Sequence, residues 1–266
     1  MSLYMLYGGT NWGSLAAPVV ATSYDYSSPI SEDRSIGSKY YETKLLSLFT
    51  RVAHDLTVTD RIGNSTSYTT NPNVKATELR NPLTNAAFYV TIHATSSLGT
   101  TESFQLHTNT SLGLLTIPQS GNIVLDGHQS KIIVTDFTFG TGHLIYSTAE
   151  VLTYTITDSQ PILVLWAPEG ESAEFYLRKE QPVAVAGCQS CRSAAVSSKV
   201  AANGTIVNIA SVSGKTIMNF NGVTIIVVDR PTAYVTWVPT LSASVSAPEN
   251  ETGKHSTPLR LPILPS

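Results

Sequence analysis

Two short motifs near the start of the chain combine glycines with aromatic and amide side chains, a set that suits a functional loop. They are Tyr7-Gly8-Gly9-Thr10-Asn11-Trp12-Gly13 and Thr22-Ser23-Tyr24-Asp25-Tyr26. Both fall in a long connection that follows a predicted strand, and in parallel α/β proteins such connections carry the chemistry. A connection of this length is unusual in a compact domain unless it has a function. The sequence therefore predicts that this loop contains functional residues.

The other side chains able to do acid–base chemistry show no catalytic pattern. Glu32 and Asp33 are adjacent in the same loop, and neighbouring carboxylates in a loop are usually solvated. The six histidines show neither the spacing of metal ligands nor a nearby nucleophile motif. Of these, His93 and His107 fit the polar faces of strands. The sequence therefore predicts no metal site.

Cys188 and Cys191 are the only cysteines, and their C-x-x-C spacing is compatible with a metal or a redox site. A zinc site needs two further ligands, and no second C-x-x-C pair or paired histidines lie nearby. No thioredoxin-like βαβ pattern surrounds the two cysteines either. Structural thiols or a local disulfide are therefore favoured over a catalytic role.

A predicted strand and a predicted helix frame the functional loop. Residues 3–7 form a continuous apolar run, which is typical of a strand buried on both faces. Apolar side chains then recur on one helical face, at Tyr41, Leu45, Leu48, Phe49 and Val52. Ser38 is the expected N-cap of this helix. Strand, loop and helix together predict one βα unit over residues 1–53.

Residues 54–239 follow the pattern of a β domain. Short apolar runs recur between turn signals, and residues 88–94 alternate as a half-buried strand does, with Phe88 on the apolar face. Asp126-Gly127 and Asn221-Gly222 are each expected to close a hairpin. The predicted fold is mainly β, with an antiparallel β-sandwich-like domain after the βα unit.

The motifs resemble the end of the catalytic barrel of the family 35 glycoside hydrolases, the β-galactosidases, in the form found in large secreted fungal enzymes. The resemblance is carried by GGTNWG and TSYDY in this order, then by Ile30-Ser31-Glu32 and Lys39-Tyr40. It continues into the β-rich second domain of those enzymes through residues 130–136, 144–151 and 228–230. It covers about residues 1–238 of the chain.

The resemblance implies a fold and an activity. Residues 1–53 would be the last βα unit of a (β/α)8 TIM barrel, and residues 54–239 the second domain. The implied activity is retaining hydrolysis of terminal β-D-galactosyl residues, without cofactor or metal, by two glutamates ~5 Å apart. In the family both glutamates precede the GGTN segment, so we expect a fragment without catalytic residues, inactive alone. Residues 240–266, rich in Pro and Ser, depart from the family and are expected to be a disordered tail.

The resemblance also assigns a substrate contact. Tyr26 matches the tyrosine that contacts galactose in the family, and a phenol suits both the C–H face and the polar rim of a sugar. Asn11, Trp12 and Tyr24 are expected to line or support the same pocket. Core packing is the alternative for each of these side chains.

Composition and sequons favour a secreted protein. Charged residues make up 13% of the chain, and the net charge of −3 gives no basis for binding nucleic acid. No apolar run is long enough to cross a membrane. N-x-S/T sequons predict glycosylation at Asn64, Asn109, Asn203 and Asn250. An extracellular monomer is expected, although no signal peptide is recognised at Met1.

Two other functions stay open at this point. The β domain could be a stand-alone, non-catalytic module that binds glycans or serves as a structural accessory. A thiol-redox function of Cys188 and Cys191 is the third possibility. Saturable binding of a galactan without hydrolysis would favour the first of them.

Overall fold

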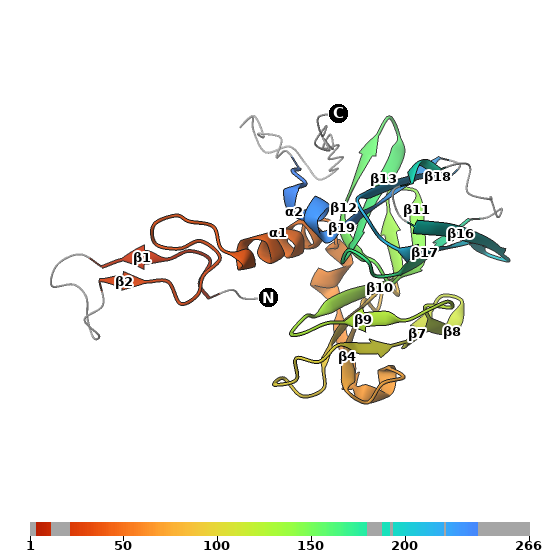
Figure 1. The fold of residues 1–266 in the computed structure, drawn as a ribbon. Helices are drawn as coiled ribbons and strands as arrows, with labels where there is room; N and C mark the ends of the chain where they lie inside the picture. Colours follow the sequence, from red (N-terminus) through yellow and green to blue (C-terminus); the bar gives the residue numbers. More distant parts are fainter. Residues whose placement is uncertain (1–3, 12–21, 180–187, 192–193, 221, 239–266) are drawn as a thin grey trace. The chain divides into compact units, whose positions relative to one another are not determined.

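The structure, a computed structural model, describes residues 4–11, 22–179, 188–191, 194–220 and 222–238. The predicted substrate contact Trp12 and the predicted tail at 240–266 lie outside the described residues. The chain divides into two units, Met1–Thr50 and Arg51–Ser266, which we describe separately. In Figure 1 the first unit runs from red to orange and the second from orange to blue.

The first unit contains a short hairpin and one helix (Figure 1). Strand β1 (Gly9–Thr10) pairs antiparallel with β2 (Ser23–Tyr24), and helix α1 spans Ser38–Thr50. The predicted helix is confirmed, and its buried side chains are Leu45, Leu48 and Phe49. Ser38 is the first helical residue and not the residue before it, a shift of one position that is common at helix ends.

The strand predicted at residues 3–7 is wrong for the residues that the structure describes. Tyr4 is 81% exposed, Leu6 and Tyr7 are also exposed, and only a single bridge joins Tyr7 to Ile30. A buried strand needs a partner on each side to satisfy its backbone groups. Among the described residues of this unit, Ile30 alone forms a bridge with the segment, so Tyr4, Leu6 and Tyr7 stay exposed.

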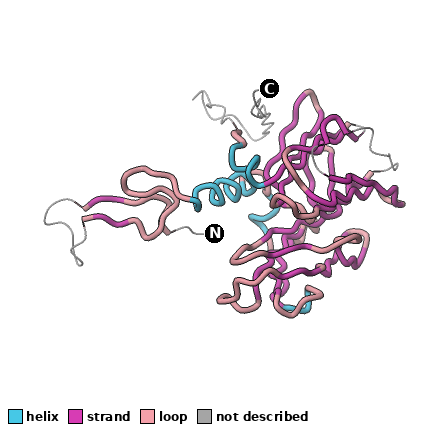
Figure 2. Tube along the Cα trace, viewed as in Figure 1, coloured by secondary structure: helices cyan, strands magenta, loops and turns pink. Residues whose placement is uncertain are grey.

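Most of the regular elements of the second unit are strands (Figure 2). Its first elements are η2 (His54–Val58), β3 (Asp60–Ser65), η3 (Thr66–Tyr68), β4 (Val74–Arg80), β5 (Ala87–His93), β6 (Glu102–Phe104), β7 (Leu106–Thr110), β8 (Gly113–Ile117), β9 (Ile123–Leu125) and β10 (Lys131–Phe139). Then follow β11 (Gly142–Ser147), β12 (Glu150–Thr157), β13 (Gln160–Ala167), β14 (Ala173–Arg178), β15 (Cys188–Cys191), β16 (Ala194–Ala201), β17 (Gly204–Ser211), β18 (Lys215–Phe220), β19 (Val223–Asp229) and α2 (Arg230–Val235).

These strands form two main sheets and two two-stranded sheets. The eight-stranded sheet has the order β16-β17-β14-β11-β10-β5-β4-β3, and the five-stranded sheet has the order β12-β13-β19-β18-β15. Strand β6 pairs with β9, and β7 pairs with β8. The mainly β, sandwich-like architecture predicted from the sequence is confirmed.

The large sheet is buried on both faces at its centre. Successive strand residues point to opposite faces, and both Phe175 and Tyr176 of β14 are buried. The Phe175 ring packs against Phe220 of the five-stranded sheet, with centroids 6.2 Å apart. Tyr176 belongs instead to a core cluster that includes Phe104 and Leu125, from the β6–β9 pair. The second unit therefore has apolar layers on both sides of its main sheet.

The five-stranded sheet is mixed, whereas the sequence predicted an antiparallel domain. Strands β13 and β19 run parallel, with Ile162 opposite Thr224 and Ala167 opposite Asp229. Parallel neighbours need a long crossover. Between β13 and β19 the chain passes through β14, β16 and β17 of the other sheet, and this path supplies the crossover.

One of the two predicted hairpins is confirmed and the other is wrong. Phe220 and Val223 are paired ends of β18 and β19, and Gly222 has the positive φ of 77° that this tight turn requires. Asp126-Gly127 does form a turn, but β9 pairs with β6 and not with β10, which follows the turn. Pairing with a remote strand thus overrides the local turn signal.

In β5, several side chains predicted to face solvent are buried, and one predicted to be buried is exposed. Tyr89, Thr91 and His93 are buried, and Ile92 on the supposed apolar face is exposed. The buried polar groups are paired, since the His93 Nε2 lies 3.0 Å from the Thr100 carbonyl oxygen. The view of His93 as part of a solvent-facing polar side is therefore wrong, whereas His107 is exposed as expected.

Candidate functional site

The two sequence motifs of the first unit are joined by backbone hydrogen bonds. The Asn11 amide donates to the Thr22 carbonyl oxygen at 2.7 Å, next to the β1–β2 pair. The Gly8 amide donates to the Ile30 carbonyl oxygen at 2.8 Å. The loop predicted to be functional is thus folded back on the glycine-rich segment.

Both neighbouring glycines are needed for this close approach. A Cβ on Gly8 would overlap the Oδ1 of Asp25, and a Cβ on Gly9 would lie 2.5 Å from the Tyr24 hydroxyl. Real Cβ atoms do not come this close to other heavy atoms. Glycine at these positions lets the tyrosine-bearing segment lie directly on the backbone.

Three tyrosine rings gather on this loop. The Tyr26 ring lies 6.4 Å from Tyr24 and 5.8 Å from Tyr4, measured between centroids. Tyr26 is 68% exposed and has a positive φ of 48°. The structure thus brings together the predicted site residues Tyr24 and Tyr26, with the backbone of Asn11 at the adjoining strand. Tyr4 was missed because its apolar run predicted a buried strand.

The adjacent carboxylates Glu32 and Asp33 both have lowered pKa values. The Glu32 carboxylate accepts hydrogen bonds from Ser23 and Thr10, and these lower its pKa. Ser35 donates to the Asp33 carboxylate and lowers its pKa. A general acid needs a raised pKa, so neither group is suited to protonate a leaving group. The sequence-based expectation that neither is catalytic stays a prediction.

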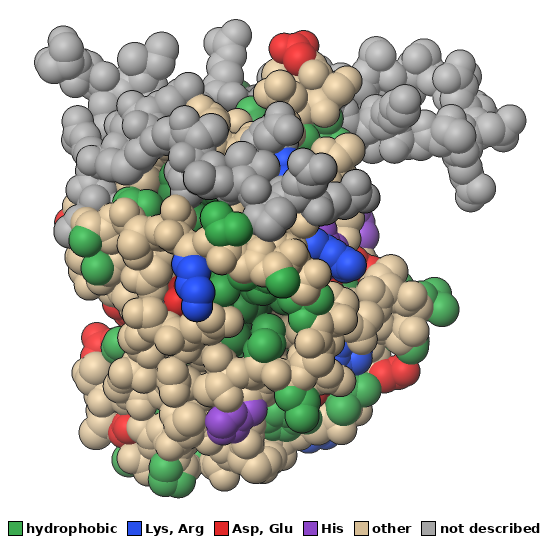
Figure 3. All heavy atoms as spheres, turned by 90° about the vertical axis from the view of Figure 1, so that its right-hand side faces the viewer, with side chains coloured by type: hydrophobic (Ala, Val, Ile, Leu, Met, Phe, Trp, Pro, Cys, Tyr) green, Lys and Arg blue, Asp and Glu red, His purple; other side chains and the backbone are tan. Residues whose placement is uncertain are grey.

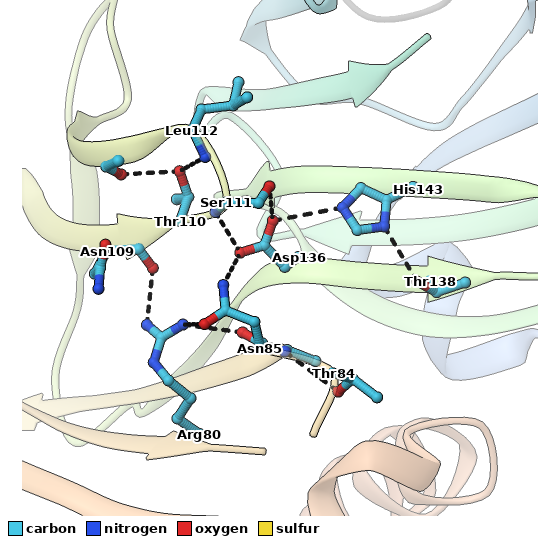
Figure 4. Close-up of polar contacts among 12 residues, drawn as sticks. Arg80, Thr84, Asn85, Asn109, Thr110, Ser111, Leu112, Asp136, Thr138 and His143 are labelled. Atoms are coloured by element: carbon cyan, nitrogen blue, oxygen red, sulfur yellow. Dashed lines mark hydrogen bonds and ion pairs between the residues drawn. The ribbon is translucent and has the colours of Figure 1, made fainter. Parts of the chain in front are cut away.

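A second polar cluster lies in the β unit, around Asp136 (Figure 4). The Asp136 carboxylate is 2% exposed and accepts from Asn85 Nδ2 at 2.9 Å. It also accepts from the backbone amide of Ser111 at 2.8 Å and from its hydroxyl at 2.6 Å. His143 Nε2 approaches the same carboxylate at 3.4 Å. Two connecting segments and strand β11 are therefore tied to one buried charge.

Arg80 adds a second link to the β7–β8 hairpin. Its guanidinium donates to the backbone oxygen of Asn85 at 2.9 Å and to that of Asn109 at 2.7 Å (Figure 4). Burial by itself raises the pKa of Asp136, but hydrogen bonds from His143 and Ser111 outweigh it, so this pKa lies below its ordinary value. The cluster has the satisfied contacts of a structural anchor.

Other predicted sites are placed but not tested by the structure. Asn64, Asn109 and Asn203 are exposed, and Asn250 lies outside the described residues. The backbone of Cys188 and Cys191 lies in β15, while their side chains lie outside the described part.

The described residues show neither a metal centre nor a membrane span. They contain no group of three His, Cys, Asp or Glu side chains that could hold a metal ion. No helix among them is long and apolar enough to span a membrane. One face of the β unit, in Figure 3, carries charged side chains only at scattered points, in keeping with the low content of charged residues.

Comparison with known proteins assigns both units to β-galactosidase families. Residues 1–49 match the family described as "Glycosyl hydrolases family 35", and residues 56–235 match "Beta-galactosidase, domain 2". A protein of Aspergillus terreus called "Probable beta-galactosidase B" is 60% identical over 253 residues, which cover 94% of this chain and 25% of the relative. Proteins of the same name from Pyrenophora tritici-repentis and Emericella nidulans are 57% and 56% identical, over 94% and 97% of this chain and 25% of each relative.

The glycine–tyrosine loop with its helix, followed by a sandwich-like β unit, thus has the make-up of part of a glycosyl hydrolase. More particularly, the chain belongs to the β-galactosidase domain 2 family. The resemblance stated from the sequence motifs is confirmed. The chain spans about a quarter of the length of the curated relatives that it matches.

Proposed function

We propose that the chain is part of a retaining β-galactosidase and that its first unit contributes to the pocket for the terminal galactosyl group. In this proposal residues 1–53 are the last βα unit of a TIM barrel, and residues 54–239 are the second domain. Support comes from the match of residues 1–49 to the family 35 glycosyl hydrolases and from the names of the relatives. Glycans as non-catalytic ligands and thiol redox chemistry have no comparable support.

The observation that carries the proposal is the exposed Tyr26 ring within the matched loop. Its hydroxyl offers a hydrogen bond to a sugar, and its face offers contact to the sugar's C–H groups. Tyr24 supports Tyr26 through the ring contact and lies on Gly9. We assign Asn11 and Trp12 to the same pocket, on the basis of the family motif alone.

The test is a chimera, defined here as the Aspergillus terreus relative in which the matched quarter is replaced by this chain. We expect the chimera to hydrolyse an aryl β-galactoside. The change Tyr26→Phe should lower kcat/KM by about 10-fold, the effect of one hydrogen bond to the substrate. An inactive but folded chimera, or full activity of Tyr26→Phe, would contradict the proposal.

The 266-residue chain by itself serves as the matched negative control. Retaining hydrolysis needs an acid and a nucleophile ~5 Å apart on the two sides of the bond. Glu32 and Asp33 have lowered pKa values, which does not suit the acid. We expect this chain alone to release no galactose. Release of galactose that Tyr26→Phe slows would show that the chain carries its own catalytic pair.

We also propose an extracellular, glycosylated and monomeric protein. The exposed positions of Asn64, Asn109 and Asn203 support glycosylation, which takes place in the secretory pathway. The chimera is expressed in a filamentous fungus and collected from the culture medium. Enzymatic deglycosylation should lower its apparent mass. Sedimentation of the same sample should give the mass of one chain. A purely intracellular, unmodified product or a stable dimer would argue against these assignments.

A further inference from the structure

The turn that presents Tyr26 has a backbone conformation that its residues do not favour. The Ser28 amide donates to the Asp25 carbonyl oxygen at 2.8 Å, which closes a four-residue turn. Its two central residues, Tyr26 and Ser27, have positive φ values of 48° and 56°. Turns with positive φ at both centres normally carry Gly, Asn or Asp there, and a bulky residue in this region is strained. Such strain persists only where the surroundings enforce it, often at ligand contacts.

Side chains on either side of the turn provide this enforcement. The Asp25 Oδ1 accepts from the Glu32 backbone amide at 2.6 Å, which fastens the start of the turn to the returning loop. The Lys39 Nζ donates to the Ser27 carbonyl oxygen at 2.9 Å, which ties the strained centre to the first turn of α1. The Ser28 hydroxyl donates to the Ile30 carbonyl oxygen at 2.7 Å.

Gly8 leaves the space in which the first of these contacts forms. A Cβ at this position would overlap the Asp25 Oδ1 and come within 2.7 Å of the Glu32 amide nitrogen. The glycine of the first motif and the aspartate of the second are thus parts of one junction. Together the two motifs fix the turn between Asp25 and Ser28.

We propose that Asp25 and Lys39 are positioning residues that hold Tyr26 in its strained conformation for contact with the galactosyl group. The inference rests on the proposed function of Tyr26. Asp25 acts through its bond to the Glu32 amide, and Lys39 through its bond to the Ser27 carbonyl group. Neither side chain needs to touch the sugar.

The first test is a double-mutant cycle in the chimera. Asp25→Ala should lower kcat/KM by about 10- to 100-fold, because a small misplacement of a contact residue has effects of this size. In the Tyr26→Ala background the same change should add less than about 2-fold, because Asp25 acts only through Tyr26. Asp25→Asn keeps an oxygen acceptor for the Glu32 amide and should restore activity to within about 3-fold.

Asp33→Ala is the matched control for the first test. Asp33 lies in the same loop, and its carboxylate also accepts from a backbone amide, that of Ser35 at 2.9 Å. This hydrogen bond lies outside the Asp25–Ser28 turn that carries Tyr26. If Asp33→Ala costs as much as Asp25→Ala, or if Asp25→Ala costs as much with Tyr26 already removed, the positioning role is wrong and general loosening of the loop explains the loss.

The second test concerns Lys39. Lys39→Met should lower kcat/KM by about 10-fold, and Lys199→Met, the same change on an exposed lysine of β16, should leave it unchanged. Adding Ser27→Asn to Lys39→Met should recover most of the loss, because Asn tolerates positive φ better than Ser does. Failure of Ser27→Asn to recover any activity would contradict the role of Lys39 in enforcing the strain.

The 266-residue chain provides a readout that does not depend on activity. Hydrogen exchange of the Ser28 amide reports whether the turn is closed. We expect exchange to quicken at least about 10-fold in Asp25→Ala and Lys39→Met, and to stay unchanged in Asp33→Ala. Unchanged exchange in the first two variants would overturn the inference even if Tyr26→Ala impairs the chimera. If exchange changes as expected but Tyr26→Ala leaves the kinetics intact, the proposed function fails, and the link between the turn and the sugar fails with it.

Discussion

Two regions of the molecule hold a non-glycine residue at positive φ with the help of an aspartate, yet they differ in burial. In the first unit, Asp25 fastens a turn whose Tyr26 has φ of 48° and is 68% exposed. In the β unit, Asp136 itself has φ of 50° and is 2% exposed. The first region is held by a few contacts at the surface, whereas the second is enclosed by donors from separate strands and turns.

The two regions therefore use a strained backbone for different ends: the first presents a side chain to solvent, and the second anchors the fold. We expect the Tyr26 turn to open without loss of β-unit stability, because the hydrogen bonds of Asp25 and Lys39 that hold it join residues of the first unit. Asp136 ties the β4–β5 connection through Asn85 and the β7–β8 turn through Ser111 to the main sheet. We therefore expect changes at the first region to affect ligand contact and changes at the second to affect folding.

The largest effect is expected from Asp136→Ala. It leaves the Ser111 amide, the Ser111 hydroxyl and the Asn85 side-chain amide without their acceptor. These donors are part-buried, and a hydrogen bond to a charged group contributes about 1.5–3 kcal/mol, so we expect a loss of about 3–5 kcal/mol in the free energy of unfolding. Urea unfolding of the 266-residue chain, followed by circular dichroism, measures it.

The matched control for this change is Asp158→Ala. Asp158 also has a positive φ, of 49°, but it lies exposed in the β12–β13 turn. It therefore reports the cost of placing Ala in the left-handed region, about 1 kcal/mol. Equal losses for the two variants would mean that backbone conformation, and not the buried contacts, dominates at Asp136.

The next largest effect is expected from Gly8→Ala in the chimera. The added methyl group displaces Asp25 from the Glu32 amide, so kcat/KM should fall by about 100-fold. Gly37→Ala is the control, because its Cβ would meet only the Pro29 carbonyl oxygen, at an ordinary 3.6 Å. The unfolding of the β unit should be the same in both variants. A parallel loss of β-unit stability in Gly8→Ala would remove the contrast between the two regions.

The sequence predicted those parts of the fold that are determined locally. The spacing of Leu45, Leu48 and Phe49 predicted α1, and Asn221-Gly222 predicted the β18–β19 turn. The pairing of β9 with β6 and the parallel β13–β19 pair were not predictable, because each partner lies beyond intervening strands. The buried face of β5 was misassigned, since its polar side chains are satisfied by partners that a single strand does not reveal.

Prediction of the candidate site was limited in the same way. The motifs that carry Tyr24 and Tyr26 led to the loop through family resemblance, and the structure supplies the reason for the adjacent glycines. The exposed ring of Tyr4 was hidden by its apolar neighbours. No pattern in the sequence pointed to Asp136, because its partners come from three different connections and strands.

A smaller effect is expected at the Asn109-Thr110-Ser111 sequon, whose last residue also binds Asp136. Ser111→Ala removes one hydroxyl donor to the buried Asp136, so we expect a loss of about 1–2 kcal/mol in unfolding free energy. Asn109→Gln abolishes the same sequon but keeps the backbone contacts of Asn109 with Arg80 and Tyr89. It should change stability by less than about 0.5 kcal/mol in unglycosylated protein. A reversed order would show that the exposed asparagine contributes more than the buried network.

The smallest effect is expected in the dependence of the unfolding free energy on pH, at acid pH. Hydrogen bonds from His143 and Ser111 hold the pKa of Asp136 below its ordinary value, so the folded state binds this proton less readily than the unfolded chain. This contribution is complete above the unfolded pKa of about 3.9 and is lost as the pH falls through the lower folded pKa. Stability of the wild-type chain should therefore drop more steeply below about pH 4 than that of Asp136→Asn, which cannot take up the proton. Unfolding midpoints of the two proteins, measured between about pH 2 and pH 6, decide the matter. If Asp136→Asn kept the wild-type slope, the buried carboxylate would not be the ionised anchor on which the contrast with the Tyr26 turn depends.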